Sequence, residues 1–343
     1  MGQYAFRRML AVFPVLLAVY TVTFFLFQIT PGGPWDRERP VPREVVENLN
    51  RKYGLDRPMW QQYVDYLAGV VTRFDFGPSY KRVSRTVTDI IGDFLPTSAT
   101  LGIVAVGLAV AIGIPLGVLS ALRPNSALDH LASFLAVVGY SIPSFIIGPL
   151  LIWICALWLG WLPTGGADTW RHYVLPAITL SLAPLALFAR YTRSALLDVT
   201  HADYVRTARA KGLRESMIVV RHALRNALIP VATIGGVITA EIIVGSFYVE
   251  TVFAVPGLGR YFVTSVTDRD YPVLMGVTLL FASAITIVNL LVDVFYGYLD
   301  PRIRYDQEDL SIAGVSHGLT PAMSGAVRTD WPRCTLTALT GSY

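Results

Sequence analysis

The feature that most constrains this chain is a series of long segments without a charged residue. Only 15% of its 343 residues are Asp, Glu, Lys or Arg, and 53% are hydrophobic, whereas about a quarter of the residues in soluble domains are charged. The uncharged segments are Met9–Trp35, Phe94–Leu122, His130–Ala167, His172–Ala189, Asn226–Ala240 and Tyr271–Val292. A helix needs roughly 20 mostly apolar residues to cross a bilayer. The pattern excludes a soluble protein and predicts an all-α, polytopic membrane protein.

We expect six transmembrane helices. Their predicted positions are Met9–Ile29, Ala99–Leu122, one tilted helix within Leu131–Leu162, Tyr173–Tyr191, Ala227–Phe247 and Tyr271–Leu299. The first resembles a signal peptide, but its apolar segment is longer than the usual 7–15 residues and has no small-residue cleavage site after it. It is therefore expected to remain as a span. The third is expected to be irregular near Gly139–Pro143.

The distribution of basic residues predicts the orientation in the membrane. The Ser194–Ala227 loop has six Lys or Arg residues against three acidic ones. Short loops rich in Lys and Arg stay in the cytoplasm, so this loop and both termini are predicted to be cytoplasmic. The Pro31–Thr97 segment has nearly balanced charge, and apolar residues at helical spacing in Val45–Leu55 and Met59–Val71. It is predicted to be a small extracytoplasmic helical insert, either shielding the outer helix ends or docking a partner.

These observations divide the chain into four parts. Residues 1–30 form the N-terminal transmembrane helix, residues 31–97 the extracytoplasmic insert, and residues 98–300 a five-helix core that includes the 194–227 loop. Residues 301–343 mix Ser, Thr, Gly and Pro without periodicity, and a disordered cytoplasmic tail is expected.

The sequence lacks the motifs of the common enzyme and cofactor sites. None of its three lysines (Lys52, Lys81 and Lys211) is followed by Ser or Thr, as the phosphate-binding P-loop requires. The five histidines are scattered, and the two cysteines suggest neither a disulfide framework nor a metal site. We expect a non-enzymatic chain without a cofactor or metal. Its basic character is attributed to Arg residues at membrane boundaries rather than to nucleic-acid binding.

Polar residues within predicted spans are candidates for a translocation pathway, because burying charge in a membrane is costly. Glu241 interrupts the fifth span, Glu250 follows it, and Asn289 lies in the sixth. For Glu241, packing within the protein and lining of a pathway are both open. For Asp293, near a span end, a structural role is favoured.

The most informative segment is the basic loop, in which an Ala-rich, helix-prone stretch ends at a glycine. Its candidate functional residues are Tyr204, Val205, Arg206, Thr207, Ala208, Arg209, Ala210, Lys211, Gly212, Leu213 and Glu215. Beyond Gly212, an apolar stripe at helical spacing is formed by Leu213, Met217, Val220 and Leu224. Two interpretations remain open: the helices press on a soluble partner, or they lie on anionic lipid headgroups.

Several ordered motifs resemble those of bacterial ABC-importer permeases, most of all the B-type subunit of dipeptide and oligopeptide importers. The loop residues 204–212 and 221–230 are similar to the EAA-loop region of that family. Further matching segments are Tyr53–Pro58, Ile142–Phe145, Leu159–Pro163, Glu250–Phe253, Pro256–Arg260, Arg269–Pro272 and Leu299–Tyr305. Two departures are Arg206-Thr207-Ala208 in place of Glu-Ala-Ala and Phe74-Asp75-Phe76-Gly77 in place of Gly-Asp-Leu-Gly.

The resemblance implies a MetI-like permease core in a bacterial inner (plasma) membrane. It implies a second, C-type permease, two cytoplasmic ATPases that bind the ATP, and an extracytoplasmic substrate-binding protein as partners. The matching residues Tyr204 to Glu215 would form the helix that couples to an ATPase. Short peptides are the expected substrate, with nickel or haem as an alternative within the same machinery. An ion-coupled secondary transporter is an alternative of another class, and a membrane enzyme is a third.

Overall fold

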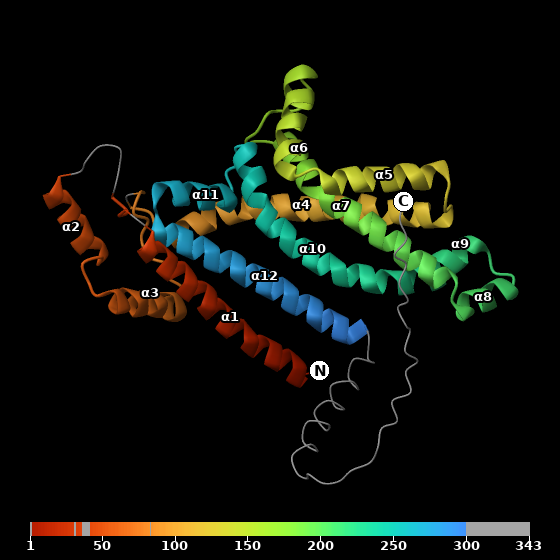
Figure 1. Cartoon of the computed structure of the whole chain (residues 1–343), viewed down its shortest axis with the longest axis horizontal. Helices are drawn as coiled ribbons and strands as arrows, with labels where there is room; N and C mark the ends of the chain where they lie inside the picture. The colour runs from red at the N-terminus through yellow and green to blue at the C-terminus, as the bar shows by residue number, and fades with distance from the viewer. Residues whose placement is uncertain (1, 31, 36–41, 83, 300–343) are drawn as a thin grey trace, which may run out of the picture. The chain divides into compact units, whose positions relative to one another are not determined.

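Helices make up the regular structure of this chain almost completely. The computed structural model describes residues 2–30, 32–35, 42–82 and 84–299. The helices are α1 (Gly2–Ile29), α2 (Arg43–Tyr53), α3 (Met59–Arg73), α4 (Val87–Leu122), α5 (Ala127–Ser141), α6 (Ser144–Leu151), η1 (Ile152–Trp158), α7 (Trp170–Thr200), α8 (Asp203–Ala210), α9 (Glu215–Met217), η2 (Ile218–Ala223), α10 (Leu224–Val252), α11 (Leu258–Asp268) and α12 (Tyr271–Leu299) (Figure 1). Within these residues the β structure is limited to an isolated bridge between Pro78 and Thr86. The all-α prediction is confirmed, whereas the expected tail at residues 301–343 lies outside the described residues.

Five helices of the described part are long and apolar enough to cross a membrane, and a bent helix pair, counted as one span, would bring the number to six. The five spans are Met9–Ile29, Val87–Leu122, Trp170–Thr200, Ile218–Ala240 and Tyr271–Val292. The two helices expected within residues 31–97 are present as α2 and α3, and the extracytoplasmic location of this insert stays a prediction. The second span begins earlier than predicted because Thr86 and Asp89 form a capping box at its N-terminus, which satisfies the first free N–H groups of the helix.

The third crossing differs from the prediction of one tilted helix. α5 ends at Ser141, α6 begins at Ser144, and the two directions differ by 103°. The break lies at Ile142–Pro143, within the region predicted to be irregular. Proline has no N–H group to donate and disfavours helical geometry in the residue before it, and Ile142 accordingly has an extended backbone (φ −88°, ψ 118°). The crossing is therefore a broken helix.

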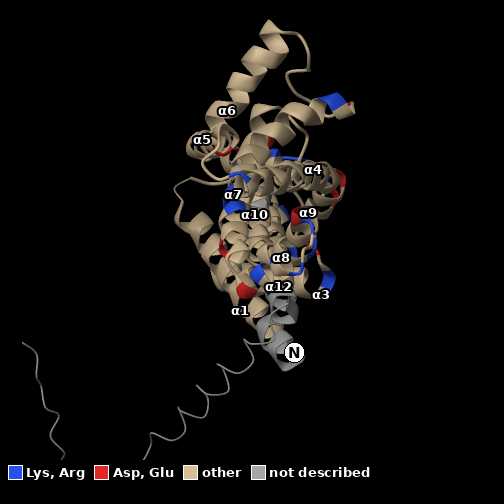
Figure 2. Ribbon diagram, turned by 90° about the vertical axis from the view of Figure 1, so that its right-hand side faces the viewer, with Lys and Arg blue, Asp and Glu red and all other residues tan. Residues whose placement is uncertain are grey.

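The centre of the bundle is formed by α4, α7 and α10. Most of the ribbon in Figure 2 is tan, and the charged residues form short, scattered segments. One face of α4 carries small residues at four-residue spacing, including Ala105, Ala109, Gly113 and Gly117, and this face is buried. A Cβ atom on Gly113 would lie 2.7 Å from the carbonyl oxygen of Leu185 on α7, and one on Gly117 would lie 2.5 Å from that of Ala189. Small residues therefore allow the α4 and α7 backbones to touch.

A buried ion pair fastens the end of this bundle that lies next to α8. Asp129 of α5 accepts two hydrogen bonds from the Arg193 guanidinium of α7, Nε to Oδ1 at 2.7 Å and Nη2 to Oδ2 at 2.8 Å. Asp129 also accepts a hydrogen bond from the Ser120 hydroxyl of α4 and one from the backbone N–H of Asn125. Three helices are joined by one carboxylate.

At the other end of the bundle, α3 packs against α1 and α12. Tyr20 and Phe24 of α1 form an apolar cluster with Met275 and Leu279 of α12, and Tyr63, Tyr66, Leu67 and Val70 of α3 pack against that cluster. The loop after α3 is held by the buried Asp270 carboxylate, which accepts hydrogen bonds from the Ser79 hydroxyl and the Tyr80 N–H. The insert is thus attached to two spans.

Candidate coupling segment and membrane acids

The loop residues singled out in the sequence form a short helix with one buried face. Tyr204 to Ala210 belong to α8, Lys211 to Leu213 form the turn, and Glu215 begins α9. Val205 and Ala208 are buried against Ile218 of η2, and Leu213 is half-buried. The exposed residues are Tyr204, Arg206, Thr207, Arg209, Ala210, Lys211, Gly212 and Glu215. α8 therefore presents a mostly polar surface above a small apolar base.

Three local features fix the shape of this segment. The Arg209 guanidinium donates two hydrogen bonds to the Glu215 carboxylate across the turn, at 2.6 and 3.3 Å, and these bonds lower the pKa of that carboxyl. Gly212 has φ +73°, a conformation that side-chain-bearing residues rarely adopt. The Asn226 amide donates a hydrogen bond to the Tyr204 hydroxyl at 2.8 Å, which connects α8 to α10.

The helix that follows buries a different face from the one its apolar stripe suggests. Met217 and Val220 of the stripe are 45% and 65% exposed, whereas Ile218, Val219 and Ala223 are buried. Residues 218–223 form the π-helical turn η2, whose wider i→i+5 geometry shifts the faces away from α-helical spacing. Because the stripe assumed a continuous α-helix, it does not describe the packed face.

Glu250 is completely buried near the end of α10. Its Oε2 atom accepts hydrogen bonds from the backbone N–H groups of Gly259, at 2.7 Å, and Arg260, at 3.3 Å. These N–H groups belong to the first turn of α11, where a negative charge is favourable. Gly257 and Gly259 leave no space for a Cβ atom beside this carboxylate. Glu250 therefore positions α11 in this conformation, and its role in a translocation pathway stays a prediction.

The two other pathway candidates lie on neighbouring helices. Glu241 belongs to α10, and its side chain is not among the described ones; Asn289 is exposed on α12. A Cβ atom on Gly236 of α10 would collide with Val292, so Asn289 lies near the α10 segment around Gly236. That segment is 14 residues, or roughly 21 Å, from Glu250 along the helix. The structure thus separates Asn289 from Glu250.

The sequence interpretation missed the Asp129–Arg193 pair and the anchoring role of Asp270. A partial signal exists for Asp129, because the Ser126 hydroxyl accepts a hydrogen bond from the Asp129 N–H at the start of α5, as expected of Ser at a helix N-cap. Nothing in the sequence pairs Asp129 with a residue 64 positions away.

The fold and these sites define a class of protein: a multi-span membrane subunit with an exposed polar helix between two of its spans, α7 and α10. The comparisons agree. Residues 113–305 match the family described as the binding-protein-dependent transport system inner membrane component, and residues 1–102 match the N-terminal domain that accompanies it. The chain belongs to this family. It is a multi-pass permease subunit of an inner membrane and not an enzyme, which removes the secondary transporter and the membrane enzyme as alternatives.

Relatives with recorded functions match over almost their entire length. The chain is 46% identical over 307 residues to the dipeptide transport system permease protein DppB of Bacillus subtilis (strain 168), covering 89% of this chain and 98% of the relative. It is 41% identical to the oligopeptide transport system permease protein OppB of Escherichia coli (strain K12), with 89% and 100% covered. It is 40% identical to OppB of Haemophilus influenzae (strain Rd), with the same coverage.

Solved structures show the same fold at lower sequence identity. Two inward-facing crystal forms of the MetNI methionine ABC transporter superpose with TM-scores of 0.51 and 0.52, at 18% and 19% identity. They cover 62% of this chain and 97% and 96% of the matched chain. The predicted MetI-like core is therefore confirmed as a fold.

Proposed function

We propose that this chain is one of two membrane subunits through which an ATP-driven importer passes short peptides into the cell. Membership in a binding-protein-dependent family supports ATPase and substrate-binding partners in general. The peptide substrate is supported by the dipeptide and oligopeptide systems in which similar permeases work. The assembly would contain a second, C-type permease, two cytoplasmic ATPases and one extracytoplasmic binding protein.

We further propose that α8 and the turn after it transmit the motion of an ATPase to the spans. The observation that carries this proposal is the division of α8 into two faces. Val205 and Ala208 attach it to η2, while Arg206, Thr207 and Ala210 are exposed. A polar surface held between α7 and α10, with the small residues Ala210 and Gly212 at its end, suits a protein groove, because small side chains allow close approach and a force on the helix reaches both spans.

An alanine-to-tryptophan substitution on the exposed face tests coupling without disturbing the core. In the reconstituted importer, Ala210→Trp is expected to leave assembly intact while peptide uptake falls at least tenfold and ATP hydrolysis no longer responds to the loaded binding protein. Gly212→Pro is expected to act in the same way, because it changes the turn that ends α8. The matched control is Ala68→Trp, an exposed alanine on α3, which should transport normally. Uptake at the normal rate by Ala210→Trp and Gly212→Pro would contradict the coupling role.

The substrate requires a separate experiment, because the binding protein supplies much of the selectivity in such systems. Proteoliposomes with the complete importer, oriented with the ATPases in the lumen, are expected to accumulate labelled dipeptides or oligopeptides when the lumen contains ATP. Accumulation of nickel or haem without peptide uptake would overturn the substrate assignment while leaving the coupling proposal intact.

A further inference from the structure

Helix α3 of the insert carries an apolar stripe that nothing in the described chain covers. Trp60 is 69% exposed, Val64 51% and Val71 67%. With 100° between successive residues of an α-helix, these three side chains point within about 40° of one another. Scattered apolar residues on a surface are ordinary, whereas three aligned on one helix face mark a contact surface.

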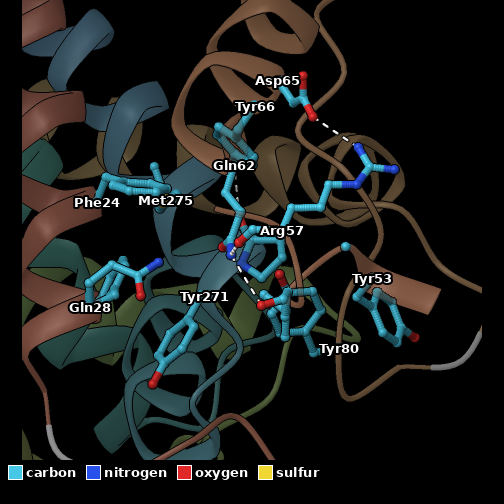
Figure 3. A pocket seen from close by; sticks show the side chains of 14 residues that line it. Phe24, Gln28, Tyr53, Arg57, Gln62, Asp65, Tyr66, Tyr80, Tyr271 and Met275 are labelled. Carbon is cyan, nitrogen blue, oxygen red and sulfur yellow. Dashed lines mark hydrogen bonds and ion pairs between the residues drawn. The ribbon is translucent and has the colours of Figure 1, made fainter. Parts of the chain in front are cut away.

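The remaining surface of α3 divides into two further faces. One is packed: Tyr63, Leu67 and Val70 contact the apolar cluster of α1 and α12. The other is polar, and Asp65 on it forms an ion pair with Arg57 at 2.9 Å. Figure 3 shows this pair pointing away from Phe24 and Met275, the residues of α1 and α12 that lie behind α3. The helix therefore has a protein side, a water side and an uncovered apolar side between them.

The contacts with two spans place α3 at membrane depth. The Tyr20 hydroxyl donates a hydrogen bond to the Tyr63 carbonyl at 2.7 Å, and Tyr20 lies eight residues before Gln28, near the end of the span Met9–Ile29. On the other span, Leu279 of the same cluster lies eight residues after Tyr271. Eight helical residues span about 12 Å, and half of a hydrocarbon core is roughly 15 Å thick. Measured along either span, the contact with α3 therefore falls in the half of the membrane next to Gln28 and Tyr271.

Aromatic and polar residues gather beside the start of α3, next to the ends of both spans. A cavity of about 190 Å³ lies between α1, α12 and the start of α3. Its walls combine Phe24 and Met275 with Gln28, Arg57 and a group of tyrosines: Tyr53, Tyr66, Tyr80 and Tyr271 (Figure 3). Tyrosine is enriched where a membrane meets water, because its ring is apolar and its hydroxyl is not. This composition is typical of a membrane–water boundary.

The stripe is also continuous with an exposed apolar surface of a membrane span. On α1, Val22, Phe25 and Leu26 are exposed within a membrane span. The Phe25 ring stacks on Tyr63 of α3, with ring centroids 6.1 Å apart. This exposed apolar side of α1 thus passes directly onto α3.

We propose that α3 lies in the outer leaflet of the membrane, with Trp60, Val64 and Val71 in contact with phospholipid acyl chains. Its polar face, with Asp65, is directed to the extracytoplasmic water. An amphipathic helix of this kind lies in the plane of the interface with its apolar face buried 5–10 Å into the lipid. The bilayer then fixes the height of the insert relative to the spans, and the insert is a membrane-supported platform rather than a projecting domain.

Spin labels on neighbouring residues test the proposal. Cys155 and Cys334, the two cysteines of the chain, are replaced by serine, and single cysteines are introduced as Val64→Cys and Val71→Cys. Thr72→Cys is the matched control, because Thr72 is exposed and adjacent to Val71 but lies on the polar face. The assembled importer is placed in nanodiscs, and relaxation of each label by molecular oxygen and by a water-soluble nickel chelate is measured.

Oxygen is expected to relax the labels at positions 64 and 71 several times more strongly than the nickel chelate does, with the reverse at position 72. Equal accessibility to the nickel chelate at positions 71 and 72 would overturn the proposal. Protection of positions 64 and 71 from both reagents would also overturn it, because a protein partner would then cover the stripe. A second measurement needs no spin label. The fluorescence of Trp60 is obtained by subtracting the emission of the Trp60→Phe complex from that of the wild-type complex, and lipids with brominated acyl chains should quench it.

Discussion

Helices α8 and α3 are both short amphipathic helices attached to opposite ends of one helical bundle, but they leave different surfaces uncovered. α8 is attached through small side chains, Val205 and Ala208, and its exposed residues are mostly polar. α3 is attached through large ones, including Tyr63 and Leu67, and exposes a tryptophan and two valines. The comparison teaches that the exposed face, rather than amphipathicity itself, separates the two proposals: a protein groove for α8 and lipid for α3.

The two ends also differ in how they are fastened. Near α8, the pair between Arg193 and Asp129 is buried on the carboxylate side, whereas the Arg57–Asp65 pair beside α3 is more than half exposed on both sides. If burial decides the strength of such pairs, breaking the first should have a much larger effect than breaking the second.

The largest expected effect comes from Arg193→Ala. Removing one member of a buried pair leaves the Asp129 carboxylate without its counter-ion, which costs about 3–5 kcal/mol in soluble proteins. We expect the thermal midpoint of the purified complex in nanodiscs to fall by several degrees and uptake to be lost. The double variant Arg193→Ala/Asp129→Ala should recover part of the stability, because no charge remains buried. A single variant as stable as the wild type would show that the pair does not hold α5 to α7.

The next effect concerns the core that joins the two ends. Gly117→Leu places a side chain where a Cβ atom alone would lie 2.5 Å from the Ala189 carbonyl oxygen. Overpacking of this kind costs about 1–3 kcal/mol, and the thermal midpoint should fall. Gly107→Leu is the control, because nothing lies within 4 Å of a Cβ atom there. Equal midpoints for the two variants would mean that α4 and α7 tolerate separation.

A smaller effect on stability, but a selective one on function, is expected from Gly212→Ala. Alanine at φ +73° is disfavoured by about 1 kcal/mol, although space for its methyl group is available. The turn should therefore shift while the fold persists, so that uptake per ATP hydrolysed falls at an almost unchanged thermal midpoint. Gly212→Asn should retain more coupling, because asparagine adopts this conformation more readily. Equal uptake ratios in all three proteins would show that the turn conformation has no part in coupling.

The smallest effect is expected from Arg57→Ala beside α3. Exposed ion pairs contribute about 0.2–1 kcal/mol, so the thermal midpoint should change by a degree or less. If this variant destabilises the complex as much as Arg193→Ala does, then burial does not explain the difference between the two ends.

The sequence predicted the spans well because their signal is additive over many residues. The spans Met9–Ile29 and Tyr271–Leu299 needed only composition, and helices α2 and α3 needed only helical spacing. The bend at Ile142–Pro143 was located but its size was underestimated, because proline signals a break without fixing the angle. The packed face after Gly212 does not coincide with the apolar stripe, because a π-helical turn leaves no mark in apolar spacing.

The site was harder to predict than the fold. The residues predicted to couple form one segment, α8 and the turn after it, yet only the structure separates the buried Val205 and Ala208 from their exposed neighbours. Glu250 was recognised as an acidic residue near a span. Its contact with the start of α11 could not be predicted, because it requires the Gly259 N–H to lie within hydrogen-bonding distance of the carboxylate, which only the folded chain shows. Arg193 and Asp129 could not be paired, because their contact arises only when α5 packs on α7.

The close approach of α4 and α7 limits the kinds of movement available to a transport cycle. The Cα atoms of Gly113 and Gly117 in α4 lie close to carbonyl oxygens of α7. Neither helix can therefore slide or rotate against the other without a collision between the Phe188 or Thr192 side chain of α7 and the backbone of α4. The two helices therefore act as a single lever about 36 residues long. A displacement delivered where α7 ends at Thr200 would tilt that lever as one piece, and the gap that admits solute would have to open along its less tightly fitted neighbours.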